Sequence, residues 1–189
     1  MGRWGKLSTK WVIVGESGVY LYISSQIKSN SVINIIGTYE CKADTKGRVM
    51  FPAALKKQLE KIIGEGFVIK RSVFNQCLEI HPMNEWNEVV RQVNQLNRFM
   101  KKNNDFIRSY MAGLKVVELD GSGRFLIPKD LLSFAGLEKE IVLSSSVSMI
   151  EIWDKNRYES SVSETLKDFG NLAEDVMGKQ PINKPDGIS

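Results

Sequence analysis

Two short segments of the chain place an arginine directly after a tight turn that begins with an aspartate. Residues 44–48 read Asp-Thr-Lys-Gly-Arg, and residues 120–124 read Asp-Gly-Ser-Gly-Arg. A guanidinium group is planar and permanently charged, so an arginine on a rigid turn is suited to bind a phosphate or the edge of a guanine. Each aspartate can instead form an ion pair with its own arginine across the turn. Both interpretations hold at once if the aspartate orients the arginine for a ligand.

The residue types in these turns predict how the turns are held. An aspartate at the first position accepts hydrogen bonds from nearby backbone N–H groups, and a glycine at the last position supplies a positive φ. The residues that we expect to orient the two loops are Asp44, Gly47, Asp120 and Gly123. Lys46 occupies the tip of the first turn, whereas Ser122 holds the matching place in the second.

The chain offers few residues for catalysis or metal binding. His81 is its single histidine, and it precedes Pro82 at the end of a predicted strand, where we expect a surface or capping role. Cys41 alternates with polar neighbours and is expected in the core, and Cys77 lies too far along the chain to form a Cys-x-x-Cys pair with it. The sequence therefore predicts no catalytic residue, no metal site and no cofactor.

The two turns belong to an internal repeat. Residues 37–59 read GTYECKADTKGRVMFPAALKKQL, and residues 113–132 read GLKVVELDGSGRFLIPKDLL. The shared pattern is an apolar strand, the Asp-x-x-Gly-Arg turn, three apolar residues, a proline and a short helix. Two copies are too few for a solenoid, so they predict one pseudo-symmetric domain in which each half completes the other.

The first repeat predicts its elements in order. Residues 39–43 alternate between apolar and charged types, as a half-buried strand does, and residues 49–51 return as the second strand of a hairpin. Pro52 suits the first turn of a helix and Gly64 is typical of a helix end, so we expect a helix over 53–63. The remaining strands are expected at 67–69, 77–80, 141–143 and 149–152.

Apolar residues at helical spacing predict helices outside the repeats. We expect one helix over 83–101, a second over 106–112 that residues 103–105 cap, and a third along 162–176. The last twelve residues contain two Pro and two Gly, which is typical of a disordered tail.

The net charge alone does not identify a partner. The 189 residues include 26 Lys+Arg and 22 Asp+Glu, a net charge of +4. Residues 37–112 carry 13 basic and 8 acidic side chains, whereas residues 113–160 carry 6 and 8. A basic front half suits an anionic partner, although ordinary surface variation produces the same asymmetry.

The apolar stretch 12–23 is too short to span a bilayer, so we expect neither export nor a membrane span.

The duplicated unit of strand, Asp-x-x-Gly-Arg turn, strand, proline and helix resembles the MraZ family of bacterial transcriptional regulators, which is related to AbrB-type DNA-binding proteins. The resemblance covers about residues 33–158. It implies an α+β fold, a duplicated, swapped-hairpin, double-split β-barrel with flanking helices. The expected organisation is an N-terminal extension at 1–32, the first AbrB-like repeat at 33–86, inter-repeat helices at 87–112, the second AbrB-like repeat at 113–160, and a C-terminal helix with a disordered tail at 161–189.

Residues 1–31 have no counterpart in the family. We hypothesise that they are not part of the natural protein and that translation begins near Val32. An intact mass of the native protein that includes Met1 would refute this hypothesis.

The resemblance also implies a function. Family members form ring-like homo-oligomers that bind repeated sites in double-stranded DNA upstream of the division and cell-wall gene cluster. We therefore expect a cytoplasmic, nucleoid-associated regulator that is not an enzyme. Family members use the basic hairpin loop for DNA, which makes Arg48 the first candidate contact, with Lys46 and Lys42 as helpers and Arg124 as the counterpart in the second repeat.

Two expectations qualify this function. Because the second turn lacks the tip lysine, we expect the first repeat to face DNA and the second to serve mainly fold and assembly. The alternative function is a β-barrel module for oligomerisation or protein interaction that does not bind DNA. The acidic second half and the apolar helix between the repeats support this alternative.

Overall fold

The computed structural model describes residues 3–7, 10–15, 18–22 and 33–178, and the chain divides into two compact units, 1–33 and 34–189. The first unit holds an antiparallel sheet whose strands pair in chain order, β1 (Arg3–Leu7), β2 (Lys10–Gly15) and β3 (Gly18–Tyr22). The sequence did not predict these strands. The predicted C-terminal tail lies, from residue 179 onward, outside the described residues.

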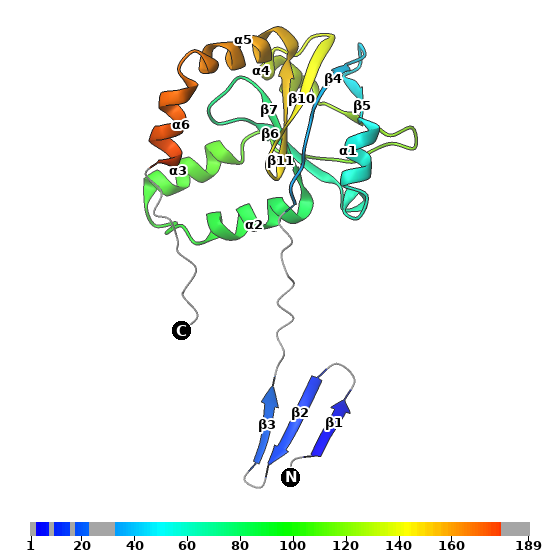
Figure 1. The fold of residues 1–189 in the computed structure, drawn as a ribbon, viewed down its shortest axis with the longest axis vertical. Coiled ribbons are helices and arrows are strands. Elements are labelled where there is room, and N and C mark those ends of the chain that lie inside the picture. Colours follow the sequence, from blue (N-terminus) through cyan, green and yellow to red (C-terminus); the bar gives the residue numbers. More distant parts are fainter. Residues whose placement is uncertain (1–2, 8–9, 16–17, 23–32, 179–189) are drawn as a thin grey trace. The chain divides into compact units, whose positions relative to one another are not determined.

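In the second unit, strands and helices occur in the same order in both repeats: two strands, a helix, two strands and a further helix (Figure 1). Its strands are β4 (Thr38–Lys42), β5 (Arg48–Met50), β6 (Phe67–Arg71), β7 (Leu78–Pro82), β8 (Lys115–Val117), β9 (Arg124–Leu126), β10 (Glu140–Ser146) and β11 (Met149–Asp154). Its helical segments are α1 (Ala53–Gln58), the 3₁₀ turn η1 (Ile63–Glu65), α2 (Met83–Asn94), α3 (Lys101–Tyr110), α4 (Lys129–Ala135), α5 (Lys155–Leu166) and α6 (Phe169–Met177). This mixture of helices and antiparallel strands confirms the predicted α+β class.

The larger sheet exchanges strands between the two repeats. Its order is β4-β10-β11-β7-β6-β8, and every neighbouring pair is antiparallel. β4 of the first repeat pairs with β10 of the second, and β8 of the second repeat pairs with β6 of the first. β7 and β11 meet at the centre, where Ile80 lies opposite Ile150. Each repeat therefore adds its first strand to the hairpin of the other.

β5 and β9 form a separate antiparallel ribbon that carries both turns. Val49 and Phe125 lie directly opposite each other at its centre, and both are buried. Phe51, which follows β5, packs against Phe125 with 6.0 Å between ring centres and against Phe67 of β6 with 5.6 Å. The ribbon is therefore fixed to the core by its inward face, and the turns start from a rigid base.

The predicted C-terminal end of the first helix was wrong. α1 ends at Gln58 rather than at residue 63, and the chain then reverses through η1 before β6 begins. Leu59 is buried at this reversal, and its carbonyl oxygen accepts hydrogen bonds from the backbone of Ile62 and Ile63 at 2.9 and 2.8 Å. Burying Leu59 directs the chain back toward the sheet, and this requirement of the tertiary fold has no signal in the local helical pattern.

The helices predicted over 83–101 and 106–112 were also wrong in their bounds. α2 ends at Asn94, and α3 begins at Lys101. Asn97 lies in the interruption, where its side-chain oxygen accepts from the Phe99 backbone N–H at 2.9 Å and its backbone oxygen accepts from the Asn103 side chain at 2.8 Å. Asparagine side chains compete with helical hydrogen bonds in this way. Residues 103–105, predicted as a cap, consequently lie inside α3.

The C-terminal helix is interrupted where the sequence predicted one continuous segment over 162–176. α5 ends at Leu166, α6 begins at Phe169, and Asp168 occupies the N-cap position of α6. The Asp168 carboxylate makes no hydrogen bond to the backbone N–H groups that begin α6 and instead accepts from the side chain of Asn171 at 2.5 Å. None of the helices in the described part of the chain is long and apolar enough to cross a membrane.

Candidate nucleic-acid interface

The first Asp-x-x-Gly-Arg segment forms a closed hairpin turn. The backbone N–H of Gly47 donates to the Asp44 carbonyl oxygen at 2.9 Å, and the Asp44 N–H donates to the Arg48 carbonyl oxygen at 3.0 Å. Gly47 has a φ of +82°, in the left-handed region that residues with side chains rarely adopt. This is the geometry of a tight turn followed by a glycine bulge, as the residue types predict.

The Asp44 carboxylate fixes both the turn and the arginine. Its Oδ1 accepts from the backbone N–H groups of Lys46 and Arg48 at 2.8 and 2.9 Å, and its Oδ2 accepts from Arg48 Nε at 2.7 Å. These hydrogen bonds, led by the one from the Arg48 backbone, lower the pKa of Asp44 to about 2. The carboxylate therefore stays charged near neutral pH and holds the guanidinium through Nε, which leaves the terminal NH2 groups outside this contact.

The second segment is similar, but its arginine also uses a terminal nitrogen: Arg124 Nη2 lies 3.1 Å from Asp120 Oδ2. Asp120 Oδ1 accepts from the backbone N–H groups of Ser122 and Arg124 at 2.8 and 3.0 Å, and Oδ2 accepts from Arg124 Nε at 3.1 Å. Gly123 has a φ of +78°, and backbone hydrogen bonds led by that of Arg124 lower the pKa of Asp120. In both turns the aspartate carboxylate therefore contacts backbone N–H groups and the arginine, and the glycine has a positive φ.

The ribbon links the two turns directly. The Ile127 N–H donates to the Gly47 carbonyl oxygen at 2.9 Å, and the Phe51 N–H donates to the Gly123 carbonyl oxygen at 3.0 Å. The turns lie at opposite ends of β5 and β9 because the two strands run antiparallel. Each turn is therefore hydrogen-bonded to the residue that follows the strand of the other turn.

Both arginines lie on the outer face of the ribbon. In the register, Arg48 lies opposite Leu126, and Arg124 lies opposite Met50. Opposite residues of an antiparallel pair share a face, and the inward positions between them are buried. The side chains of Arg48 and Arg124 are 39% and 34% exposed, so both remain accessible to a ligand. As diagonal neighbours in the register, their backbones are separated by about 7–8 Å.

The two predicted lysines occupy different surroundings. Lys46 is exposed at the tip of the first turn, two residues from Arg48. Lys42 is exposed at the end of β4, in the larger sheet, where it lies opposite Glu140 of β10. Lys46 therefore lies close to Arg48 in the chain, whereas Lys42 belongs to the larger sheet, across from an acidic residue.

A lysine that the sequence did not single out reaches the second turn. A side chain at Gly123 would meet Lys56 Nζ of α1 at 2.7 Å, so this ammonium group lies against the turn that lacks its own lysine. At the equivalent position of α4, Leu132 packs against Gly47. The exchange between repeats therefore places a cation of the first half beside the arginine turn of the second. The position of Lys56 beside the second turn depends on how the two repeats pair, which the sequence pattern around Lys56 does not indicate.

A buried polar cluster lies elsewhere, in β6 and β7. Glu79 Oε2 accepts from Lys70 Nζ at 2.8 Å and lies 3.2 Å from His81 Nε2. Burial raises the pKa of Glu79, but the hydrogen bonds from His81, Lys70 and Ser72 outweigh it and bring this pKa to about 2. The prediction that His81 is a surface or capping residue was wrong, because β7 is a central strand whose residues are buried.

The two cysteines differ in their burial. Cys41 is half-buried rather than in the core, because β4 is an edge strand of the larger sheet. Cys77 is buried, and burial raises the pKa of its thiol to about 12, so this sulfur is not an activated nucleophile. Among the residues that the structure describes, no group of three or more His, Cys, Asp or Glu side chains could hold a metal ion.

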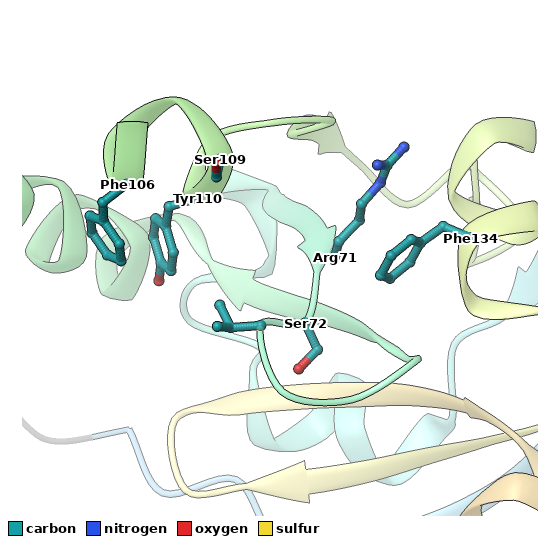
Figure 2. A pocket seen from close by; sticks show the side chains of 7 residues that line it. Arg71, Ser72, Phe106, Ser109, Tyr110 and Phe134 are labelled. Carbon is teal, nitrogen blue, oxygen red and sulfur yellow. The ribbon is translucent and has the colours of Figure 1, made fainter. Parts of the chain in front are cut away.

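A cavity of about 280 Å³ is lined by none of the turn residues. In Figure 2, the rings of Phe106 and Tyr110 of α3 lie on one side of it and Phe134 of α4 lies on the other. Arg71, at the end of β6, is its charged residue. The guanidinium carbon of Arg71 lies 4.9 Å from the centre of the Phe134 ring, and its Nε is buried without a hydrogen-bond partner in the described structure. The lining residues are Arg71, Ser72, Val73, Phe106, Ser109, Tyr110 and Phe134. They include no acid–base pair, so the cavity is not a candidate active site.

Comparison with known proteins matches the two repeats separately. The family described as "MraZ protein, putative antitoxin-like" matches residues 35–109 and 111–178. A protein named transcriptional regulator MraZ from Christiangramia forsetii is 59% identical over 158 residues, which cover 84% of this chain and 100% of that protein.

Relatives with the same name occur in other bacteria. The protein from Flavobacterium psychrophilum is 59% identical over 144 residues, covering 76% of this chain and 92% of the relative. The protein from Phocaeicola vulgatus is 34% identical over 147 residues, covering 77% of this chain and 95% of the relative. The similarity therefore extends over nearly the full length of each relative.

Proposed function

The chain belongs to the MraZ family of transcriptional regulators, and we propose that it binds double-stranded DNA in a sequence-specific manner through the outer face of the β5–β9 ribbon. One observation carries the proposal: two arginines, each held by its own aspartate, lie on the same exposed face. The similar hydrogen bonds of the second turn support Arg124 as a contact beside Arg48.

The chemistry of the contact follows from the arginines. A guanidinium fork donates two hydrogen bonds to the O6 and N7 atoms of a guanine, and each such pair contributes about 1–3 kcal/mol of discrimination against other bases. The aspartates fix the arginines before binding, which reduces the conformational entropy lost on association. Lys46, and Lys56 beside the second turn, lie where they can neutralise phosphates.

We extend the proposal to the assembled regulator. In this proposal, the larger sheet and the β5–β9 ribbon form the swapped-hairpin, double-split β-barrel that the family resemblance implies. Copies of the chain then assemble into a ring-like homo-oligomer. The ring binds repeated operator sites upstream of the division and cell-wall gene cluster, in the cytoplasm at the nucleoid, without enzymatic activity or a cofactor. Exposed apolar residues on α5 and α6, including Leu166, Phe169 and Val176, support contacts between copies.

A gel-shift experiment with DNA from upstream of the protein's own gene tests the binding site. Arg48→Ala should weaken specific binding at least about ten-fold, because one arginine–guanine pair is lost from every subunit. Arg91→Ala is the matched control, since Arg91 is an exposed arginine on α2 that is ion-paired with Glu88. Wild-type affinity should also fall steeply with salt, because neutralised phosphates release counterions.

The outcomes separate the two candidate functions. If Arg48→Ala binds as tightly as wild type, the assigned site is wrong. If wild type does not shift the DNA at all while forming oligomers, the alternative of a β-barrel oligomerisation or protein-interaction module is favoured. That alternative draws on the same exposed apolar side chains of α5 and α6.

A further inference from the structure

Two apolar side chains share the outer face of the β5–β9 ribbon with the arginines. Met50 is 54% exposed and lies opposite Arg124, and Leu126 is 52% exposed and lies opposite Arg48. Between these two pairs, the central residues of the ribbon point inward to the core. The outer face therefore presents two apolar groups and two guanidinium groups in an alternating, pseudo-symmetric arrangement.

The fold itself does not require apolar residues at these positions. Single exposed apolar side chains are common on protein surfaces and need no explanation. Here, however, equivalent positions of both repeats are apolar, and each of the two side chains stands directly across the ribbon from an arginine. Cross-strand partners have Cβ atoms about 4.5–5.5 Å apart, so the four side chains form one continuous surface.

We infer that Met50 and Leu126 determine part of the sequence specificity by contacting thymine methyl groups in the major groove. The inference rests on the proposed DNA binding. A two-stranded ribbon fits the major groove, where the C5-methyl of thymine is the apolar group that distinguishes base pairs. The ribbon would then read guanines with its arginines and neighbouring thymines with its apolar side chains.

Charge favours DNA over a second copy of the chain as the occupant of this face. A two-fold contact of the face with itself would bring the guanidinium groups of one copy toward those of the other. It would also place the exposed Lys46 side chains of both copies in one interface. The major groove instead offers thymine methyl groups and guanine edges between two rows of phosphates, which complements a face where apolar side chains alternate with guanidinium groups.

Uracil substitution tests the inference with the full-length protein. Two duplexes of the promoter DNA that wild type binds are compared by fluorescence anisotropy, one with thymine and one with deoxyuridine in its place. Wild type should bind the uracil duplex about four-fold more weakly for each contacted thymine, the factor that corresponds to burying one methyl group. Met50→Ala and Leu126→Ala should each bind the thymine duplex more weakly and show a smaller difference between the two duplexes.

The control is Val116→Ala, which removes an exposed apolar side chain from β8 at the far edge of the larger sheet. It should retain both the wild-type affinity and the preference for thymine. Equal binding of both duplexes by wild type would overturn the inference while leaving the proposed function intact. Loss of oligomers in Met50→Ala or Leu126→Ala would overturn it as well, by showing that the face joins copies of the chain. Failure of wild type to bind either duplex would remove the proposed function and the inference with it.

Discussion

At the scale of single residues, the two turns show how an ion pair and a binding site can be the same structure. Asp44 uses one oxygen for two backbone N–H groups and the other for Arg48 Nε. The aspartate therefore does not withdraw the arginine from a ligand; it sets the direction of the guanidinium group. Asp120 holds Arg124 through Nε and also lies 3.1 Å from its terminal Nη2.

The glycines of the two turns should differ in their tolerance of a side chain. An alanine at either position adopts a left-handed backbone at a cost of about 1–2 kcal/mol. At Gly47 the added Cβ also meets the Ile127 carbonyl oxygen at 2.7 Å, whereas at Gly123 it meets only the flexible end of Lys56. Gly47→Ala should therefore lower the free energy of unfolding more than Gly123→Ala, as urea denaturation can measure.

Gly121→Ala serves as the control for this comparison, because nothing lies within 4 Å of its Cβ position. It should change the free energy of unfolding little. If Gly47→Ala and Gly123→Ala lowered the free energy of unfolding equally, the close approach of Gly47 to the Ile127 carbonyl oxygen would be contradicted.

The two turns could be predicted from the sequence because their signals are local. An aspartate, a glycine and an arginine at fixed spacing specify a turn through hydrogen bonds within five residues. The apolar positions of Met50 and Leu126 were visible as part of a strand, but their direction was not. Facing outward depends on the pairing of β5 with β9, whose residues are separated by more than seventy positions in the chain.

At the scale of elements, the strands depend on partners from the other repeat. The repeat made a pseudo-symmetric domain predictable, but not which strand joins which hairpin. β7 illustrates the consequence, because its central place in the sheet buries Glu79 and His81, which look like surface residues in the sequence. The helix bounds failed for the same reason at Leu59, and for a local hydrogen-bonding reason at Asn97.

The buried Lys70–Glu79 pair should be essential for stability. Glu79→Gln would leave the buried Lys70 ammonium without its counter-charge, which typically costs about 3–5 kcal/mol. The double variant Lys70→Met/Glu79→Gln removes both charges and should be more stable than Glu79→Gln alone. Urea denaturation of both variants checks this order, and a double variant that is less stable than the single one would contradict it.

The same pair predicts a pH dependence. Glu79 has a folded-state pKa of about 2, below its ordinary value of 4.5, so its contribution to stability is fully present above pH 4.5. That contribution is lost as the pH falls toward 2. Glu79→Gln should therefore show a shallower loss of stability between pH 5 and pH 2 than wild type in denaturation experiments, and equal slopes would count against the assigned pKa.

At the scale of the whole molecule, the proposed DNA binding depends more on where the charged side chains lie than on the net charge. The total of +4 over 189 residues is modest, and much of the charge is paired on helix surfaces, as in Arg91 with Glu88. What distinguishes the ribbon is that strand exchange brings the turns of both repeats onto one structure. A chain with a single repeat would expose one turn and lack the strand that completes it.

The measurement that tests this account most directly is the DNA affinity of Arg124→Ala beside that of Arg48→Ala. Sequence alone favoured the first repeat as the binding half, because only its turn carries a tip lysine. In the structure both arginines are held by an aspartate of their own turn and lie on the same face. In fluorescence anisotropy with the promoter duplex, we predict that each variant loses at least about ten-fold in affinity. Wild-type affinity of Arg124→Ala, with binding lost only in Arg48→Ala, would contradict the claim that the two turns form one DNA-binding surface.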